Sequence, residues 1–171
     1  MPAENAKYIN VFANEGVEAT TWALNAGITL LLEIAENDAN KRQALLAISV
    51  KRDLDGMIAP VLGQPFTSQL KNHSQTDFTD PEFQGVVIDL RLMTIRNQIP
   101  FWNCPILAIH PRMALLDRIH ALHGVTDLIV VPLNPHDVED WIDAQEPEAI
   151  NRPPADAAIG DPSQAADAEN V

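Results

Sequence analysis

The chain has 171 residues, 46% of them hydrophobic, and its 11 Lys and Arg against 24 Asp and Glu give a formal net charge of −13. The length and hydrophobic share suit one globular domain with a tail, while the acidity disfavours binding to nucleic acid or anionic membranes. The single cysteine excludes an intrachain disulfide. The first residues lack the basic start and apolar run of a signal peptide, so we expect a cytoplasmic protein.

The first third of the chain predicts a short strand followed by two long helices. Residues 8–14 alternate in part and are typical of a strand, although a first helical turn also fits. Residues 17–36 have apolar side chains on one face at helical spacing, and Gly27 lowers the helical propensity of this segment. A second helix is predicted over 38–59, with Asp38 as its N-cap.

The middle of the chain predicts a loop and then a strand. Residues 63–80 are polar and irregular, so we expect a long loop that acts as a functional lid or a mobile insertion, with Phe66, Leu70 and Phe78 available to anchor it. Residues 86–93 start with β-branched side chains and then alternate, which indicates a strand; a helix from Pro81 also fits.

The last third indicates strands alternating with helices. Apolar strands are predicted over 104–109 and 125–133, and a helix over 112–123 closed by Gly124. Asn134 is the expected N-cap of a final helix. We therefore expect an α/β domain over 1–145, with a small, mostly parallel sheet covered by helices.

The composition changes at the C-terminal end. Residues 146–171 contain four prolines, many alanines and no aromatic residue, and they carry six acids against one base. Such a segment buries too little surface to offset its ordering entropy. We predict a disordered acidic tail, either solubilising or able to bind a partner.

The segment 85–144 resembles the second half of a response-regulator receiver domain, which has a flavodoxin-like fold. Asp89 stands in the position of the phosphorylated aspartate, and Glu15 in that of the acidic metal-binding pair. Val131 replaces the family lysine, and His110 replaces the switch Thr or Ser. The resemblance implies a degenerate receiver-like module that works without phosphorylation, because the groups that stabilise a transferred phosphoryl group are incomplete.

Ligands of open α/β sheets bind beyond the carboxyl ends of the strands. Polar residues expected at such ends could perform acid–base chemistry or hold an anion, or they could be ordinary caps. No sequence motif for a metal, a nucleotide or a catalytic nucleophile occurs, so we expect no cofactor and no metal site. The candidate catalytic residues are Asp89, His110 and His136, and the candidate binding residues are Glu15, Arg112 and Asn134.

These observations favour a non-enzymatic regulatory or protein-interaction domain. It would bind a protein partner or associate with itself through the helices expected at 17–36 and 38–59. One alternative is a small enzyme or anion-binding protein that uses the strand-end crevice around His110, Arg112 and His136. The other is an acidic inhibitor of a basic partner.

Overall fold

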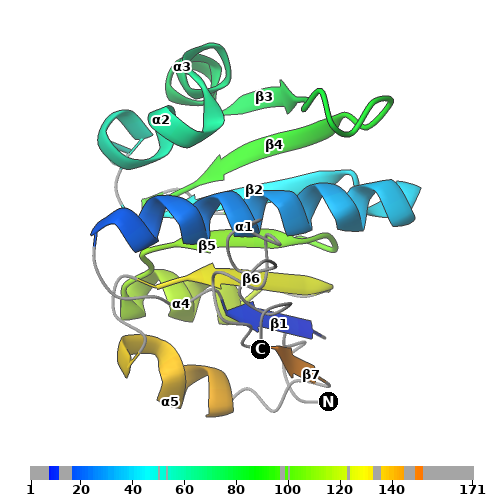
Figure 1. The fold of residues 1–171 in the computed structure, drawn as a ribbon. Helices are drawn as coiled ribbons and strands as arrows, with labels where there is room; N and C mark the ends of the chain where they lie inside the picture. The colour runs from blue at the N-terminus through cyan, green and yellow to red at the C-terminus, as the bar shows by residue number, and fades with distance from the viewer. Residues whose placement is uncertain are drawn as a thin grey trace, which may run out of the picture.

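The computed structural model describes residues 8–11, 17–49, 51–52, 54–96, 99, 101–122, 124–132, 136–144 and 149–151. Its middle layer is a seven-stranded sheet with the order β3-β4-β2-β5-β6-β1-β7 (Figure 1). The paired strands are parallel except for β3 and β4, which are antiparallel. The strands are β1 Tyr8–Val11, β2 Gln43–Ile48, β3 Gln75–Phe78, β4 Ile88–Met93, β5 Ile106–Ile109, β6 Asp127–Val131 and β7 Ala149–Asn151.

Helices cover both faces of this sheet, which gives three layers and an α/β fold (Figure 1). One face carries the long helix α1 together with a compact helical connection between β2 and β3; the other carries α4 and α5. The helices are α1 Val17–Asn37, α2 Ala59–Leu62, α3 Gln64–His73, α4 Met113–His120 and α5 His136–Ala144, with a 3-10 turn at Ala39–Lys41 and a π-helical turn at Leu54–Ile58.

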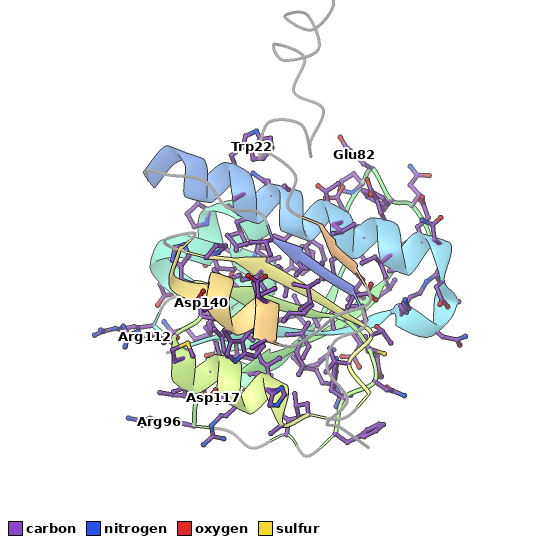
Figure 2. All side chains as sticks on the ribbon, turned by 90° about the horizontal axis from the view of Figure 1, so that it is seen from below. Trp22, Glu82, Arg96, Arg112, Asp117 and Asp140 are labelled. Atoms are coloured by element: carbon purple, nitrogen blue, oxygen red, sulfur yellow. The ribbon has the colours of Figure 1, made fainter. Side chains whose placement is uncertain are left out.

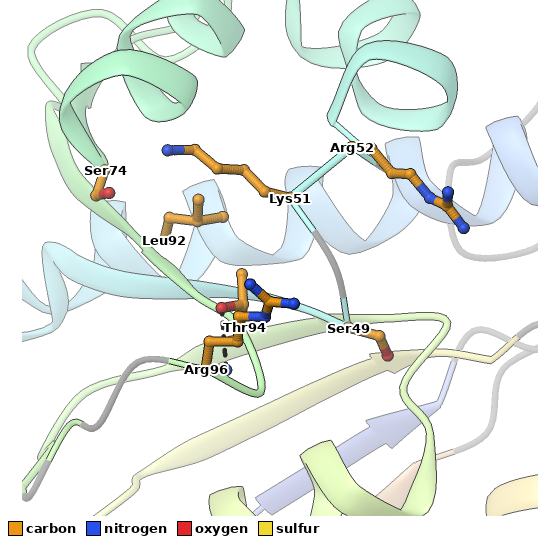
Figure 3. Close-up of a pocket in the computed structure, with 7 residues that line it drawn as sticks. All are labelled: Ser49, Lys51, Arg52, Ser74, Leu92, Thr94 and Arg96. Atoms are coloured by element: carbon orange, nitrogen blue, oxygen red, sulfur yellow. Dashed lines mark hydrogen bonds between the residues drawn. The ribbon is translucent and has the colours of Figure 1, made fainter.

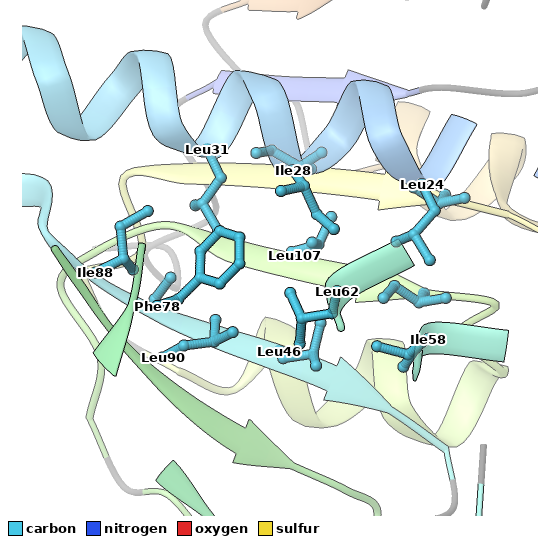
Figure 4. Close-up of a cluster of buried hydrophobic side chains, with 14 of the residues drawn as sticks. Leu24, Ile28, Leu31, Leu46, Ile58, Leu62, Phe78, Ile88, Leu90 and Leu107 are labelled. Atoms are coloured by element: carbon cyan, nitrogen blue, oxygen red, sulfur yellow. The ribbon is translucent and has the colours of Figure 1, made fainter. Parts of the chain in front are cut away.

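Two hydrophobic cores lie on the two faces of the sheet. The first joins α1 to alternate residues of the central strands, including Leu46, Leu90 and Leu107 (Figure 4). The second joins α4 and α5 to the intervening residues, such as Leu45 and Ala108. Strands buried on both faces need continuous apolar runs, which explains the pattern of residues 104–109 and 125–133.

Gly27 lets α1 approach the sheet closely. A Cβ atom at this position would lie 3.1 Å from Leu107 Cδ1 and 3.4 Å from methyl groups of Ile129 and Val131. Glycine lowers the helical propensity of α1, but its missing side chain lets the helix pack directly against strands β5 and β6.

The prediction of a second helix over 38–59 is wrong. Asp38 does act as a cap, because its side chain accepts a hydrogen bond from the Asn40 backbone at 2.9 Å, but the helix it caps is a single 3-10 turn. Residues 43–48 then form β2, which lies between β4 and β5. Their alanines and leucines are good helix formers, yet burial on both faces and backbone pairing on both sides select the strand.

The prediction of a long irregular loop over 63–80 is also wrong, because this segment contains α3 and β3. Gly63 has a φ of 100°, and Pro65 follows it in the first turn of α3. The helix is mostly polar because only a narrow stripe, including Leu70, is buried. The anchoring role expected of Phe66 and Phe78 is confirmed, since their rings meet edge to face with centroids 5.0 Å apart.

The helix at 17–36 is confirmed, and a strand lies within each of the segments 86–93, 104–109 and 125–133. These strands begin two residues later than predicted, at Ile88, Ile106 and Asp127. The helix expected over 112–123 is shorter, since α4 ends at His120 and Gly124 lies in the following turn with a φ of 87°. None of the described helices is long and apolar enough to cross a membrane.

The C-terminal strand β7 lies within the segment 146–171 that the composition predicts to be a disordered tail. It pairs with β1 through Ala149, Ile150 and Asn151. Backbone hydrogen bonds hold such a short edge strand, so the low apolar content of the segment does not prevent it. Residues 152–171 lie outside the described residues.

The receiver resemblance implies a flavodoxin-like sheet, in which the first strand lies inside the sheet next to the second and third. Here β1 lies between β6 and β7, and the interior place belongs to β2. The resemblance to a receiver domain therefore rests on the βαβ pattern of β5, α4 and β6 and does not extend to the order of all strands.

We expect Gly27→Val to lower the free energy of unfolding by about 1–3 kcal/mol, because the added side chain overpacks the contact between α1 and the sheet. Urea unfolding measures this change. Asn25→Val is the matched control, since it introduces the same side chain at an exposed position of the same helix and should change stability by no more than about 0.5 kcal/mol. Equal losses in both variants would contradict the packing role of Gly27.

Candidate functional site

The parallel strands β2, β4, β5 and β6 end at one edge of the sheet. Ala47 pairs with Met93, and Ile48 pairs with Ile109, so the residues that follow these strands lie next to one another. Ser49, Thr94 and His110 occupy these first positions beyond the sheet. This carboxyl edge is where open α/β sheets bind their ligands.

A pocket of about 590 Å³ opens at this edge, on the side of the sheet that carries α3 (Figure 3). Two of its walls are the chain beyond β2 and the end of β4, and a third comes from the C-terminal end of α3. Seven residues line it: Ser49, Lys51, Arg52, Ser74, Leu92, Thr94 and Arg96.

Three of the seven lining side chains are basic, although the whole chain has a formal charge of −13. The Lys51 side chain extends toward Ser74, Arg96 lies beside Thr94, and Arg52 extends away from both (Figure 3). No acidic side chain occurs among these described lining residues. The pocket thus combines positive charge with hydroxyl groups, a combination that binds oxyanions.

Ser49 adds a buried hydroxyl group to the pocket. The residue is 3% exposed, and its Oγ atom has no hydrogen-bond partner within the described part of the chain. A buried hydroxyl without a partner costs free energy, because it has lost its contact with water. The Ser49 oxygen points away from the side chains of Lys51 and Ser74 (Figure 3).

Backbone contacts hold the walls of the pocket in place. Ser74 ends α3 in the left-handed region with a φ of 60°; its N–H donates to Leu70 O at 2.9 Å and its carbonyl accepts from Leu92 N at 2.9 Å. The Arg96 N–H donates to Thr94 Oγ1 at 3.3 Å. Left-handed backbone at a non-glycine residue is sparsely populated and clusters at functional sites.

Asp89 lies at the opposite edge of the sheet, near the start of β4 and paired with Gln43. Its carboxylate accepts hydrogen bonds from Gln75 Nε2 at 2.9 Å and Arg91 Nη2 at 3.1 Å, on the sheet face away from α1. Burial raises the pKa of this carboxyl group, but the hydrogen bonds and charge of Arg91 and the hydrogen bonds of Gln75 and Gln43 outweigh it, so the pKa lies below its usual value. Asp89 is thus part of a structural network.

The structure brings His110 and Arg112 to the carboxyl edge but not into the pocket. His110 follows β5 with a φ of 45°, and its N–H donates to Val131 O at 2.8 Å. Arg112 is exposed before α4, and its side chain projects from the body of the molecule, on the same side as Arg96 (Figure 2). Glu15, Asn134 and the His136 side chain lie outside the described residues.

Sequence reasoning missed every residue of the pocket as a site residue. Lys51 and Arg52 lie within the segment 38–59 that the sequence predicts as a helix, but they follow the end of β2, whereas Lys41 and Arg42 precede its start. Lys41 forms an ion pair with Asp127 at 3.0 Å. Had residues 43–48 been recognised as a strand, the rule for carboxyl edges would have pointed to Ser49 and the bases after it.

No metal centre competes with the pocket in the described part of the chain, where no group of three or more His, Cys, Asp or Glu residues could hold a metal ion. Cys104 is a buried free thiol, and burial raises its pKa. A thiol of this kind is a poor nucleophile, because the thiolate is the reactive form.

Comparison with known proteins supplies no relative from which a function could be inferred. No family model matches the chain, and no curated protein matches it.

We expect the stability that Asp89 contributes to be pH-dependent. Because its pKa is lower in the folded than in the unfolded protein, the contribution is fully present above the unfolded pKa and is lost as the pH falls through the folded value. The difference in unfolding free energy between the wild type and Asp89→Asn should therefore shrink between pH 7 and pH 3. Asp117→Asn, an exposed carboxyl change on α4, is the control; a constant Asp89 difference would contradict the prediction.

We expect Ser49→Ala to leave the unfolding free energy equal to or above that of the wild type, because it removes a buried oxygen that has no described partner. Thr67→Val is the comparison, since Thr67 is equally buried but its Oγ1 donates to Gly63 O at 2.8 Å. Losing that bond should cost about 1 kcal/mol. Urea unfolding compares the two variants, and a clear loss in Ser49→Ala would show that the hydroxyl is already satisfied.

Proposed function

We propose that this chain is a non-enzymatic binding domain that holds a small anionic ligand in the pocket at the carboxyl ends of β2 and β4. The observation that carries the proposal is that three basic residues, Lys51, Arg52 and Arg96, line one pocket together with three hydroxyl side chains. In a chain with a net charge of −13, long-range repulsion opposes the approach of anions. A local group of three bases therefore points to a ligand that needs them.

The composition of the pocket favours binding over catalysis. General acids and bases are most often His, Asp or Glu, and none of these lines the described pocket, so its hydroxyl groups have no such base among the described lining residues to activate them as nucleophiles. The lining supplies positive charge and hydroxyl groups, which recognise and orient an oxyanion. His110, Arg112 and His136, the residues of the alternative crevice, are not among the lining residues.

A regulatory role fits such a binding domain and is part of the proposal. Filling the pocket joins the end of β2, the end of β4 and the C-terminal end of α3, three segments that are distant in sequence. A ligand that binds only the folded chain stabilises this arrangement, and a partner could respond to that change. The described large hydrophobic residues that are exposed, Val87, Phe101 and Met113, come from separate segments and do not define a docking face.

Loss of one basic side chain at a time tests the site. Titration calorimetry at low ionic strength, with inorganic phosphate and citrate as probes, measures the affinity of the wild type, Lys51→Met and Arg96→Met. We expect each variant to bind about tenfold more weakly, because a charge-assisted hydrogen bond contributes about 1.5–3 kcal/mol. Added salt should weaken binding to the wild type.

Arg112→Met is the matched control, since it removes the same charge from an exposed residue that does not line the pocket. Its affinity should equal that of the wild type. Equal losses in all three variants would indicate unspecific attraction to the edge of the sheet. If the wild type binds neither of these probes nor any sugar derivative tested below, the proposed function is contradicted.

A further inference from the structure

We infer, on the basis of the proposed function, that the ligand is a phosphate monoester of a small, hydroxyl-rich molecule. The phosphate group would lie between the side chains of Lys51 and Arg96, which both line the pocket. The polar remainder of the ligand would extend past Ser74 toward the open side of the pocket. Size, lining chemistry and charge each support this class of ligand.

The size of the pocket exceeds what a bare ion needs. Pockets that bury small organic ligands measure about 300–1,000 Å³, and this one measures about 590 Å³. The anionic group therefore occupies one part of the space, and an organic remainder fills the rest.

The side chains that line the pocket indicate which kind of organic remainder fits. Leu92 is the one apolar side chain among the seven lining residues, and none of the seven is aromatic. Pockets for nucleobases, lipid chains and other apolar groups are lined mostly by hydrophobic and aromatic side chains. Three hydroxyl side chains, Ser49, Ser74 and Thr94, instead suit a ligand that itself carries hydroxyl groups.

Charge favours a phosphate ester over a carboxylate. A phosphate monoester carries about −1.5 to −2 charges at neutral pH and offers three acceptor oxygens. Those oxygens can accept from the Lys51 ammonium and the Arg96 guanidinium. A carboxylate carries a single negative charge, so its attraction to the same two cations is weaker.

Calorimetry with a matched set of sugars tests the ligand class. The set is glucose 6-phosphate, glucose 6-sulfate, gluconate, glucose and inorganic phosphate, with adenosine monophosphate as a nucleotide of the same anionic group. We expect glucose 6-phosphate to bind at least tenfold more tightly than each of the others. The comparison changes the anionic group and the organic remainder separately.

The pH dependence identifies the bound group as a phosphate. The second proton of a phosphate monoester leaves near pH 6, so affinity for glucose 6-phosphate should rise between pH 5 and pH 7.5. Affinity for glucose 6-sulfate should change much less, since a sulfate ester has no such proton. The charged groups that line the pocket, Lys51, Arg52 and Arg96, and the nearby His110 act on both ligands, so the comparison removes their contribution.

Lys51→Met and Arg52→Met test the position of the phosphate within the pocket. We expect about tenfold weaker binding of glucose 6-phosphate in Lys51→Met, because the variant loses one charge-assisted hydrogen bond. Arg52→Met is the matched control, since Arg52 lines the pocket but extends away from Lys51 and Arg96 (Figure 3), and its loss should be smaller. Equal losses in the two variants would overturn the assigned position.

The outcomes separate the two proposals. Equal affinity for glucose 6-phosphate and inorganic phosphate, or tighter binding of gluconate or the nucleotide, would overturn the ligand class but leave an anion-binding domain. Tighter binding to phosphatidylcholine vesicles containing phosphatidylinositol 4-phosphate than to the soluble ester would assign the pocket to a lipid headgroup and also overturn the inference. If neither phosphate, citrate nor any sugar derivative binds, both proposals fail.

Discussion

The arrangement of the whole molecule depends on β2 being buried on both faces and paired on both sides. Its side chains alternate between the two cores, with Leu46 toward α1 and Leu45 toward α4 and α5. Its backbone pairs in parallel with β4 and β5. Because this pairing sets the register, the ends of the three strands align, and the residues beyond them form a common edge. The pocket therefore follows from a packing constraint on a six-residue strand.

The polar groups at the two edges of the sheet differ in how well they are hydrogen-bonded. Near the start of β4, Asp89 is surrounded by Arg91, Gln75 and Gln43, which satisfy its carboxylate. Beyond the end of the neighbouring β2, Ser49 buries a hydroxyl with no partner in the described chain. A satisfied polar network supports the fold, whereas an unsatisfied buried group lowers stability unless a ligand completes it. This contrast, more than the presence of charge, distinguishes the binding edge from the structural edge.

Sequence patterns predicted the elements whose signal is long or one-sided, and missed those that tertiary contacts decide. Helix α1 has five turns of regular apolar spacing, and β5 and β6 are apolar runs bounded by breakers, so their identity is local. Residues 43–48 are a short, nearly continuous apolar run rich in good helix formers, and only pairing with β4 and β5 makes them a strand. Helix α3 was missed because it buries few side chains. The site was missed with β2, since Lys51 and Arg52 mark a strand end only once that strand is known.

Net charge says little about a local site in this chain. The net charge of −13 describes the chain as a whole. It averages over parts of the chain whose local charges differ in sign. At physiological ionic strength, exposed charges are screened over about 8 Å, so a ligand inside the pocket responds mainly to Lys51, Arg52 and Arg96. The distant acids act on the approach of the ligand instead, and they disfavour large polyanions that would cover both the pocket and the acidic surface. If the pocket binds anions as proposed, an acidic domain of this kind should therefore favour compact anions over nucleic acid.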